Sequence, residues 1–373
     1  MEAKKHKGVF FELDYGKDIN LDNKDKKIIS ILGENCRISP TTIGKMIHTS
    51  KDSVRYRTNQ LIKKDIYRGN IAVLNPLSLG FPVYSILIKL KNMTSEKEEK
   101  IIQYFENHPF IIWVGQTQGA FDFSIVITSK SIVEFDKLLK EIQIKLSDSI
   151  KELKVLHMTK MYSCNTIPPE FQRQTGIKLD YEKVDSSFGS LFSTPYARLE
   201  EEKQVLSMKE VLILKTIANN ANLPLQDISE ITKIKRDTVK NMIKDLIKKK
   251  IILAFRALIN ASFLKYHGYV AYFKLYPETK EAKRKEFEEY FKNSDKICFG
   301  TEASGSYYDS MVYIFAKDPL DFNRTINEIK NKFSNIIEEY NADLILKDYK
   351  FTFLPEGIIS PLQNLFLNVA KHF

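Results

Sequence analysis

Residues 50–64 read SKDSVRYRTNQLIKK, in which basic and amide side chains recur at the spacing of one helical turn. Lys51, Arg55 and Asn59 stand four residues apart, so a helix would place them in one row. Arginine can form paired hydrogen bonds with guanine, and asparagine or glutamine can pair with adenine. The stretch therefore predicts a helix that contacts bases in the major groove of double-stranded DNA. The candidate contacts are Ser50, Lys51, Ser53, Arg55, Tyr56, Arg57, Asn59, Gln60 and Lys63.

A second stretch with the same layout, KRDTVKNMIKDLIKK, occupies residues 235–249. When the sequence is shifted by 185 residues, Val54 aligns with Val239, and matching apolar positions continue on both sides. A period of this length indicates two copies of a multi-element unit rather than a solenoid. Met242 stands in the place of Arg57, so we expect this helix to contact mainly the DNA backbone. Its candidate contacts are Lys235, Arg236, Thr238, Lys240, Asn241 and Lys244.

The positive charge of the chain is concentrated on these two stretches. The whole chain carries a formal net charge of +10, whereas residues 45–70 carry +5 and residues 233–256 carry +7. A lysine-rich helix is often only a solvated surface, but charge focused on two repeated helices is typical of a nucleic-acid partner.

Similar elements flank both stretches, and the order predicts an α+β fold. Each copy begins with three helical patterns, and Val54, Leu61 and Ile62 are expected to face the bundle in the third helix of the first copy. Asp22 and Ser39 are expected N-caps, and Thr49 or Ser50 begins the third helix. A βαββαβ order, typical of ferredoxin-like domains, follows in each copy.

The predicted fold is thus two copies of a winged helix-turn-helix domain, each followed by a ferredoxin-like domain. Phe171, Phe188, Phe192 and Tyr196 suggest that part of the connection between the copies packs on a domain. The C-terminal tail is expected to form an amphipathic helix that packs on its own domain or contacts a second chain. The expected boundaries are 1–20 (extension), 21–74 (winged helix-turn-helix), 75–162 (ferredoxin-like), 163–206 (linker), 207–260 (diverged winged helix-turn-helix), 261–355 (ferredoxin-like) and 356–373 (tail).

Several classes of chemistry are not indicated by the sequence. No apolar run approaches the roughly 18 residues that span a bilayer, and the N-terminus lacks a secretory signal, so we expect a cytoplasmic protein without membrane contact. Cys36, Cys164 and Cys298 are scattered and form no CxxC pair, which predicts no metal site and no disulfide framework. Phosphate-binding glycine motifs and the nucleophile-elbow motif are absent, and we expect no cofactor and no catalytic residues.

Residues 22–162 resemble the Lrp/AsnC family of transcription regulators. The resemblance is carried by LDNKDKKIISILGENCRIS, the helix with Arg55 and Arg57, NPLSLG at 75–80 and GQTQGAFDFSIVI at 115–127. It implies a sequence-specific DNA-binding regulator in which each winged helix-turn-helix is joined to a ligand-sensing domain. In this family two sensing domains pair sheet to sheet. The second copy, over 207–354, is more diverged.

The resemblance also implies a small-molecule effector, often an amino acid, near the glycine-containing loop of the sensing domain. Glycine lets backbone N–H groups approach a carboxylate, and an aspartate could receive an ammonium group. The alternative is a structural turn in which Asp122 bonds to the loop backbone. The candidate effector contacts are Gly115, Gln116, Thr117, Gly119 and Asp122 in the first copy and Gly305 and Asp309 in the second.

These observations lead to a hypothesis with two alternatives. One chain would carry two non-identical DNA-binding heads and favour an asymmetric site, and free strand edges and sheet faces would support a homodimer. One alternative is an enzyme that resembles siroheme decarboxylases, although the His, Arg and Tyr-Asn cluster of their sensing domain is not found around 113–127 or 299–315. The other is an assembly protein that does not bind DNA.

Overall fold

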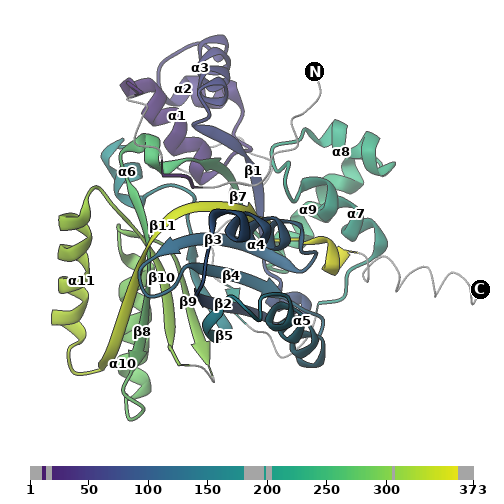
Figure 1. The fold of residues 1–373 in the computed structure, drawn as a ribbon. Coiled ribbons are helices and arrows are strands. Elements are labelled where there is room, and N and C mark those ends of the chain that lie inside the picture. Colours follow the sequence, from purple (N-terminus) through teal and green to yellow (C-terminus); the bar gives the residue numbers. More distant parts are fainter. Residues whose placement is uncertain (1–10, 14–18, 180–196, 199–203, 305–306, 360–373) are drawn as a thin grey trace, which may run out of the picture.

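The computed structural model describes residues 11–13, 19–179, 197–198, 204–304 and 307–359. Figure 1 shows two three-helix heads beside a body of β-strands that is flanked by helices. The mixed fold, with helix-turn-helix heads and ferredoxin-like βαββαβ units, is confirmed. The first half contains α1 (Asn23–Glu34), α2 (Pro40–Met46), α3 (Lys51–Lys63), β1 (Tyr67–Leu74), η1 (Leu77–Leu79), β2 (Val83–Leu90), α4 (Ser95–Asn107), β3 (Ile111–Gln118), β4 (Phe123–Thr128), α5 (Ile132–Lys145) and β5 (Ile150–Cys164).

The second half follows the same order of elements. Between the halves lie α6 (Pro169–Gln174) and the short strand β6 (Ala197–Arg198). The second half contains α7 (Met208–Ile217), α8 (Leu225–Thr232), α9 (Arg236–Lys248), β7 (Ile252–Ile259), η3 (Ala261–Leu264), β8 (His267–Leu275), α10 (Glu281–Asn293), β9 (Ile297–Ser304), β10 (Ser310–Ala316), α11 (Pro319–Phe333) and β11 (Ile337–Phe351).

Side-chain caps explain where the helices of the first head begin. The Asp22 carboxylate accepts a hydrogen bond from the Asp25 backbone at 2.8 Å, and this pair forms a capping box. Ser39 and Ser50 each accept one from a backbone N–H three residues later at 3.1 Å. These bonds satisfy N–H groups that the first turn of a helix leaves without partners. The helix starts predicted at Asp22 and Ser39 are confirmed, and of the two candidates for the third helix, Thr49 and Ser50, the N-cap is Ser50.

Unusual backbone turns recur at the offset of the sequence repeat. Residues other than glycine rarely adopt the left-handed conformation, yet several do so here at matched positions in both halves. Each pair below is separated by 185 residues, so the backbone itself repeats with the period seen in the sequence. The pairs are His48 (φ 53°) with Lys233 (58°), Asp65 (61°) with Lys250 (53°), and Gly80 (74°) with Lys265 (64°).

The sheets of the two ferredoxin-like units join into one ring of strands. The first sheet has the order β5-β2-β4-β3, and the second has the order β11-β8-β10-β9. Strand β3 pairs with β11, and β9 pairs with β5, so each end of one sheet continues into the other. The helices α4 and α5 pack on the first sheet, and α10 and α11 pack on the second (Figure 1).

The two long strands β5 and β11 close this ring. The first part of β5 pairs with β2 of its own half, and the last part, from His157 to Cys164, pairs with β9 of the other half. Strand β11 does the same with β8 and then, from Leu344 to Phe351, with β3. The two ferredoxin-like units therefore pair within one chain. The strand edges on which we based the expected homodimer are already used by these pairings.

The two heads are joined by a ribbon rather than carrying separate wings. Strand β1 follows α3, β7 follows α9, and the two pair antiparallel along their whole length. Each head also docks on the strand of the other half: the Cys36 N–H bonds to the Phe255 carbonyl at 3.0 Å, and the Ala72 N–H bonds to the Ala218 carbonyl at 2.9 Å. One continuous apolar core runs from both heads to the facing surfaces of the two sheets.

The linker, the C-terminal tail and the N-terminal extension lie outside the two repeats, and the structure describes only part of each. Phe171 in α6 is buried, as the aromatic content of the linker suggested, whereas Phe188, Phe192 and Tyr196 have no described side chains. Of the expected tail helix, residues 356–373, the structure describes only 356–359, and residues 360–373 lie outside the described part. In the expected N-terminal extension, the Leu13 N–H bonds to the Leu346 carbonyl at 2.9 Å, so this segment lies beside β11.

Three sequence-level exclusions can be compared with the described residues. No helix among them is long and apolar enough to cross a membrane. The three cysteines are buried thiols without a disulfide. Within the same residues, no group of three or more His, Cys, Asp or Glu side chains could hold a metal ion.

The contact between the heads generates a first prediction. The Arg37 guanidinium of the first head donates to the carbonyls of Ala221 (2.6 Å) and Leu223 (2.9 Å) in the second. Replacement Arg37→Met keeps the aliphatic stem but leaves both carbonyls without this donor. We expect urea denaturation to show a loss of about 1–3 kcal/mol in the free energy of unfolding.

Lys100 provides the control for this experiment, because it is an exposed residue of α4 whose ion pair with Glu96 joins two residues of the same helix. Lys100→Met should leave the free energy of unfolding unchanged within the error of the measurement. An equal effect of the two substitutions would contradict the assigned role of Arg37.

Candidate nucleic-acid interface and ligand-binding loops

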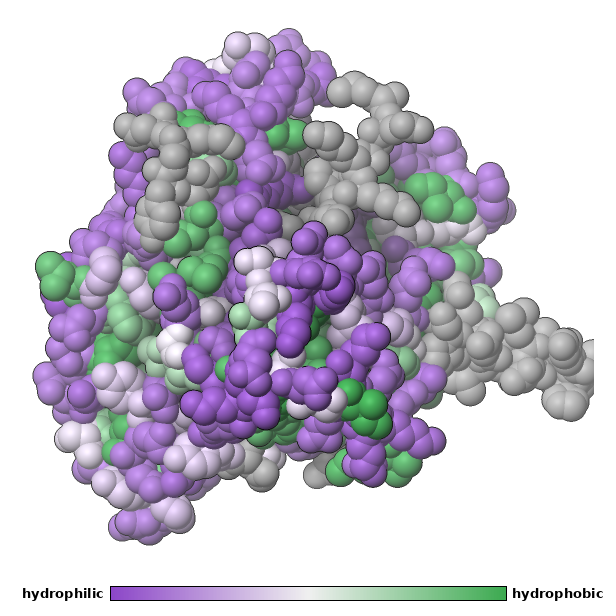
Figure 2. Space-filling model, viewed as in Figure 1, coloured by the Kyte–Doolittle hydropathy of each residue, from purple (hydrophilic) through white to green (hydrophobic). Residues whose placement is uncertain are grey.

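The third helix of the first head buries a narrow stripe and exposes a polar face. Val54 and Leu61 are buried, with Thr58 half-buried between them. Ile62, which we expected in this stripe, is 45% exposed because it lies one position beyond the row that faces the bundle. Figure 2 shows mainly hydrophilic side chains over this head, at the top of the view.

Most of the predicted DNA contacts of α3 lie on its outward face. Tyr56 is 65% exposed, and the Arg55 side chain is 61% exposed, 3.9 Å from Asp52 of the same helix. Ser50 serves as the N-cap of the helix, so its hydroxyl has a structural role. The exposed candidates are Lys51, Arg55, Tyr56, Asn59 and Lys63, and the half-buried ones are Ser53, Arg57 and Gln60.

Arg57 is turned away from the outward face, contrary to its predicted role. Its guanidinium donates to Asp22 at 2.6 Å and to Asp25 at 2.7 Å, and these are the two acids of the capping box of α1. The hydrogen bonds to Asp25 and Asp22 raise the pKa of Arg57. Two carboxylates therefore hold this arginine as a clamp between α3 and α1, and the sequence missed this because the acids lie more than 30 residues earlier.

The third helix of the second head buries more side chains and exposes fewer of the predicted DNA contacts. Val239, Ile243, Leu246 and Ile247 are all buried, compared with two residues of α3. Met242 is half-buried in the place of Arg57. The candidates Lys235, Arg236, Thr238 and Asn241 are exposed, and Lys240 and Lys244 are half-buried.

Three predicted effector residues of the first half line one surface pocket. Gln116, Thr117 and Asp122 border a pocket of about 310 Å³ together with Lys89 and other residues of the same region. The Asp122 carboxylate accepts hydrogen bonds from the Lys89 ammonium group (2.9 Å) and the Leu90 N–H (2.7 Å). The Gln116 amide is bonded to Glu98 and Tyr349. An effector at this pocket would have to compete with these bonds.

The second half repeats the same carboxylate arrangement. Asp309 accepts hydrogen bonds from the Leu275 N–H at 2.8 Å and from Arg284 at 3.0 Å. Leu275 and Leu90 are equivalent in the repeat, so both aspartates tie their loop to the first strand of the sheet. This geometry favours the structural alternative for Asp122 and Asp309. Gly305 lies outside the described residues.

Gly115 in β3 and Gly119 in the loop after β3 both permit close packing. A Cβ atom at Gly115 would collide with the indole ring of Trp113, so this position is needed for packing. A Cβ atom at Gly119, where φ is +154°, would collide with the carboxylate of Asp343. Gly119 thus permits a carboxylate to approach the loop, as the sequence suggested, but the carboxylate belongs to the protein.

Asp343 comes from β11 of the other half and is buried inside this loop. It accepts hydrogen bonds from the Ala120 N–H and, at 3.3 Å, from the Phe121 N–H. Burial raises the pKa of Asp343 to about 6, against the hydrogen bonds from Phe121 and Ala120, which lower it. No local sequence pattern indicates this residue, because only the pairing of β11 with β3 brings it to the loop.

The first half of the chain is similar in sequence to known DNA-binding regulators. The family model of the AsnC-type helix-turn-helix domain matches residues 21–62, which contain α1, α2 and most of α3. The HTH-type transcriptional regulator Ptr1 of Methanocaldococcus jannaschii is 34% identical over 122 residues, which is 32% of this chain and 80% of that protein. The HTH-type transcriptional regulator FL11 of Pyrococcus furiosus is 31% identical over 121 residues, or 32% of this chain and 78% of that protein.

The chain belongs to the Lrp/AsnC family. This confirms the resemblance drawn from LDNKDKKIISILGENCRIS and from the helix with Arg55 and Arg57.

A solved structure shares the architecture of this Lrp/AsnC protein over nearly its whole length. The siroheme decarboxylase NirDL superposes with a TM-score of 0.56 at 10% sequence identity, covering 94% of this chain and 100% of that one. At this identity the similarity shows the fold alone.

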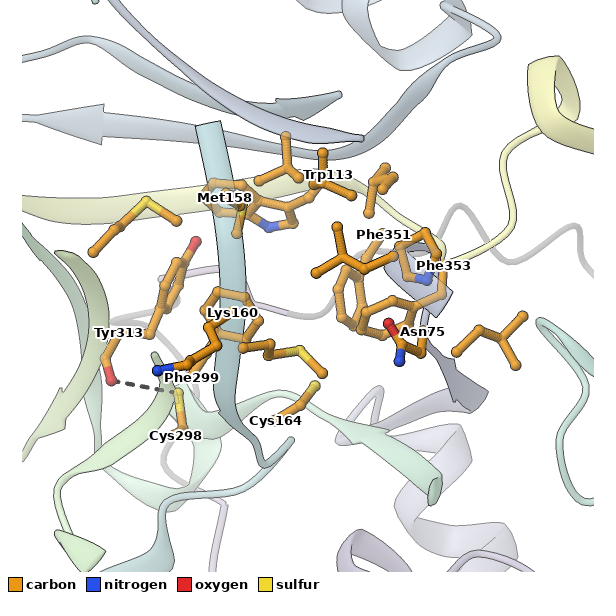
Figure 3. Close-up of a pocket in the computed structure, with 18 of the residues that line it drawn as sticks. Asn75, Trp113, Met158, Lys160, Cys164, Cys298, Phe299, Tyr313, Phe351 and Phe353 are labelled. Carbon is orange, nitrogen blue, oxygen red and sulfur yellow. Dashed lines mark hydrogen bonds between the residues drawn. The ribbon is translucent and has the colours of Figure 1, made fainter. Parts of the chain in front are cut away.

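A cavity of about 90 Å³ lies where the two sheets of this family member face each other. Its lining is mostly apolar and comes from both halves, and Figure 3 shows Trp113 and Met158 across from Cys298 and Phe299. The only ammonium or guanidinium group of the lining belongs to Lys160, which pairs with Glu288 at 2.8 Å and Glu302 at 3.0 Å.

The clamp by Arg57 generates a second prediction. Arg57→Met removes both hydrogen bonds to α1 and should lower the free energy of unfolding by about 0.5–2 kcal/mol. Arg55→Met, two residues earlier on the exposed face, should change it by less than about 0.5 kcal/mol. Chemical denaturation of both variants measures the difference, and a larger loss in Arg55→Met would contradict the assignment.

The buried carboxylate generates a third prediction. The folded protein holds the proton of Asp343 up to about pH 6, whereas the unfolded chain releases it near 3.8, so this residue makes stability fall as pH rises from about 4 to 6. Asp343→Asn keeps an acceptor oxygen and should remove that component, on the order of 1–3 kcal/mol. Chemical denaturation at several pH values measures how the free energy of unfolding changes with pH. Asp136→Asn, at an exposed site on α5, is the control, and an unchanged slope in Asp343→Asn would contradict the account.

Proposed function

We propose that this Lrp/AsnC protein is a sequence-specific DNA-binding transcription regulator that carries two different heads on one chain. The observation that carries the proposal is the outward face of α3, where Lys51, Arg55, Tyr56 and Asn59 are exposed on a helix whose other face is anchored in the head. Curated relatives that match the chain are named HTH-type transcriptional regulators. A major-groove contact by this face fits both observations.

The second head is proposed to add mainly phosphate contacts. Lys235 and Arg236 are exposed at the start of α9, where side chains approach DNA, and Lys240 and Lys244 follow along the same helix. Phosphate contacts position a protein on DNA without specifying sequence. A DNA site for one chain should therefore be asymmetric, with stronger sequence dependence in the half contacted by α3.

The ribbon of β1 and β7 fixes the separation of the heads. Because the ribbon and the cross-docked head contacts are within one chain, the two third helices do not depend on association for their spacing. We expect half-sites about one turn of DNA apart, or a multiple of it, if both heads contact one face of the duplex.

Three finer expectations continue as proposals. An amino-acid-like effector would bind at the pocket of Gln116, Thr117 and Asp122 by displacing Lys89 from Asp122. A homodimer would have to use surfaces other than the edges closed by β5 and β11. A cytoplasmic location follows from the proposed role in transcription.

The enzyme alternative rests on the fold shared with the siroheme decarboxylase NirDL. A tetrapyrrole with several carboxylates would require a large site with cations at its rim. The cavity between the sheets is about 90 Å³, and Lys160 in its lining is already paired with two glutamates. These features favour the regulator over a tetrapyrrole enzyme.

The proposed function generates a fourth prediction. Selection of DNA fragments by the full-length protein should yield an asymmetric consensus, and Arg55→Ala should weaken binding to it by roughly 5- to 150-fold, as expected for a contact worth about 1–3 kcal/mol. Lys240→Ala should weaken binding to specific and random DNA alike and reduce the salt dependence of binding.

Two controls make this experiment decisive. Lys100→Ala removes an exposed lysine of α4 with the same loss of charge, and it should leave DNA binding unchanged. A palindromic consensus would contradict the asymmetric heads. Equal effects of Arg55→Ala and Lys100→Ala on DNA affinity would contradict base contact by α3.

A further inference from the structure

The cavity between the two sheets contains one polar group without a partner. Tyr313 is buried in β10, and its hydroxyl has no hydrogen-bond partner among the described residues. Among the side chains that line the cavity, Tyr313 alone has such a buried polar atom in the described part of the chain. Figure 3 shows its hydroxyl projecting toward Met158 and Trp113. A buried hydroxyl without a partner costs free energy, so the site favours a ligand that bonds to it.

The indole of Trp113 and the ammonium group of Lys160 already have partners, which limits the chemistry of such a ligand. The Trp113 indole N–H donates to Asp348 at 2.9 Å, and the Lys160 ammonium group is held by Glu288 and Glu302. The remaining surface is formed largely by aromatic, aliphatic and sulfur-containing side chains. A charged molecule would therefore lose its hydration without gaining a counter-ion.

We infer that this cavity binds a small, neutral and mostly apolar molecule that carries one hydrogen-bonding group, with Tyr313 as its polar anchor. The cavity volume of about 90 Å³ sets the size of the ligand. An engineered apolar cavity of about 150 Å³ accepts benzene, so this smaller cavity holds a single ring only when flexible side chains of its lining, such as Met158 and Met311, move outward.

The walls of the cavity connect it to the second head. The Asn75 N–H, at the end of β1, bonds to the carbonyl of Ile251 just before β7 at 2.9 Å. The Thr166 hydroxyl, just after β5, bonds to the carbonyl of Ala257 within β7 at 2.6 Å. A molecule in the cavity would thus press on the junction between the sheets and the ribbon that holds the heads. The ligand acts as an effector of the heads, a statement that rests on the proposed function.

Binding of phenol and benzene to the full-length protein tests the site. Phenol should bind about tenfold more tightly than benzene in ligand-observed NMR titrations, because it can bond to the Tyr313 hydroxyl. Tyr313→Phe should reduce this ratio to about one while benzene still binds. Tyr307→Phe is the matched control, since it removes an exposed hydroxyl outside the lining, and it should keep the ratio.

A second variant separates loss of the site from loss of the fold. Cys164→Met adds volume at the cavity wall and should weaken both ligands at least about tenfold, with the cooperative thermal unfolding of the protein retained. The site is overturned if neither ligand saturates the wild-type protein, or if Tyr313→Phe leaves the preference for phenol unchanged.

The effector role has its own readout. Saturating phenol should slow amide hydrogen exchange at 73–77 and 251–257 and change the DNA affinity at least about threefold. If phenol binds with unchanged exchange and unchanged DNA affinity, the effector role fails and the binding site stands. If no DNA is bound at all, the proposed function fails, while the phenol titration and the exchange measurement still decide the cavity and its mechanical connection.

Discussion

The pairing of each long strand with two different sheets is the constraint on which the molecule depends. Strand β5 begins in the first sheet and ends beside β9, and β11 begins in the second sheet and ends beside β3. The two halves cannot separate unless the backbone hydrogen bonds of β5 with β9 and of β11 with β3 are broken. The inner faces of the sheets, the head ribbon and the heads then share one apolar core. A unit that resembles a dimer is thus built by a single chain.

Joining two halves in one chain allows equivalent positions to take different roles. Arg57 clamps α3 to α1 in the first head, whereas half-buried Met242 stands there in the second. Asp343 enters the first loop and directly precedes Leu344, the first residue of β11 that pairs with β3. The residue in the same position on β5 is Leu156, which directly precedes His157, the first residue that pairs with β9. Identical subunits would have to carry the same residue at both places. The covalent arrangement lets the two heads carry different side chains at equivalent positions.

Local chemistry was predictable from the sequence, and contacts between the halves were not. The helix starts at Asp22 and Ser50 and the order of strands follow from nearby residues, so periodicity and cap preferences identify them. Asp122 was expected to bond to the backbone of its own loop, but its backbone partner is Leu90 on β2, 32 residues earlier. Arg57 and Asp343 act through partners far away in the chain, and no local pattern encodes those partners. Ile62 was expected in the buried stripe but is exposed, because it lies one position beyond the row that faces the bundle.

The central claim is that one chain presents both heads to one DNA site. Hydroxyl-radical footprinting of the selected DNA, combined with the mass of the complex in solution, tests it most directly. The account predicts that a single chain protects two unlike segments about one helical turn apart, or a multiple of it, on the same face of the duplex. A complex in which each chain protects one segment only, with identical segments contacted by the first heads of two chains, would contradict it.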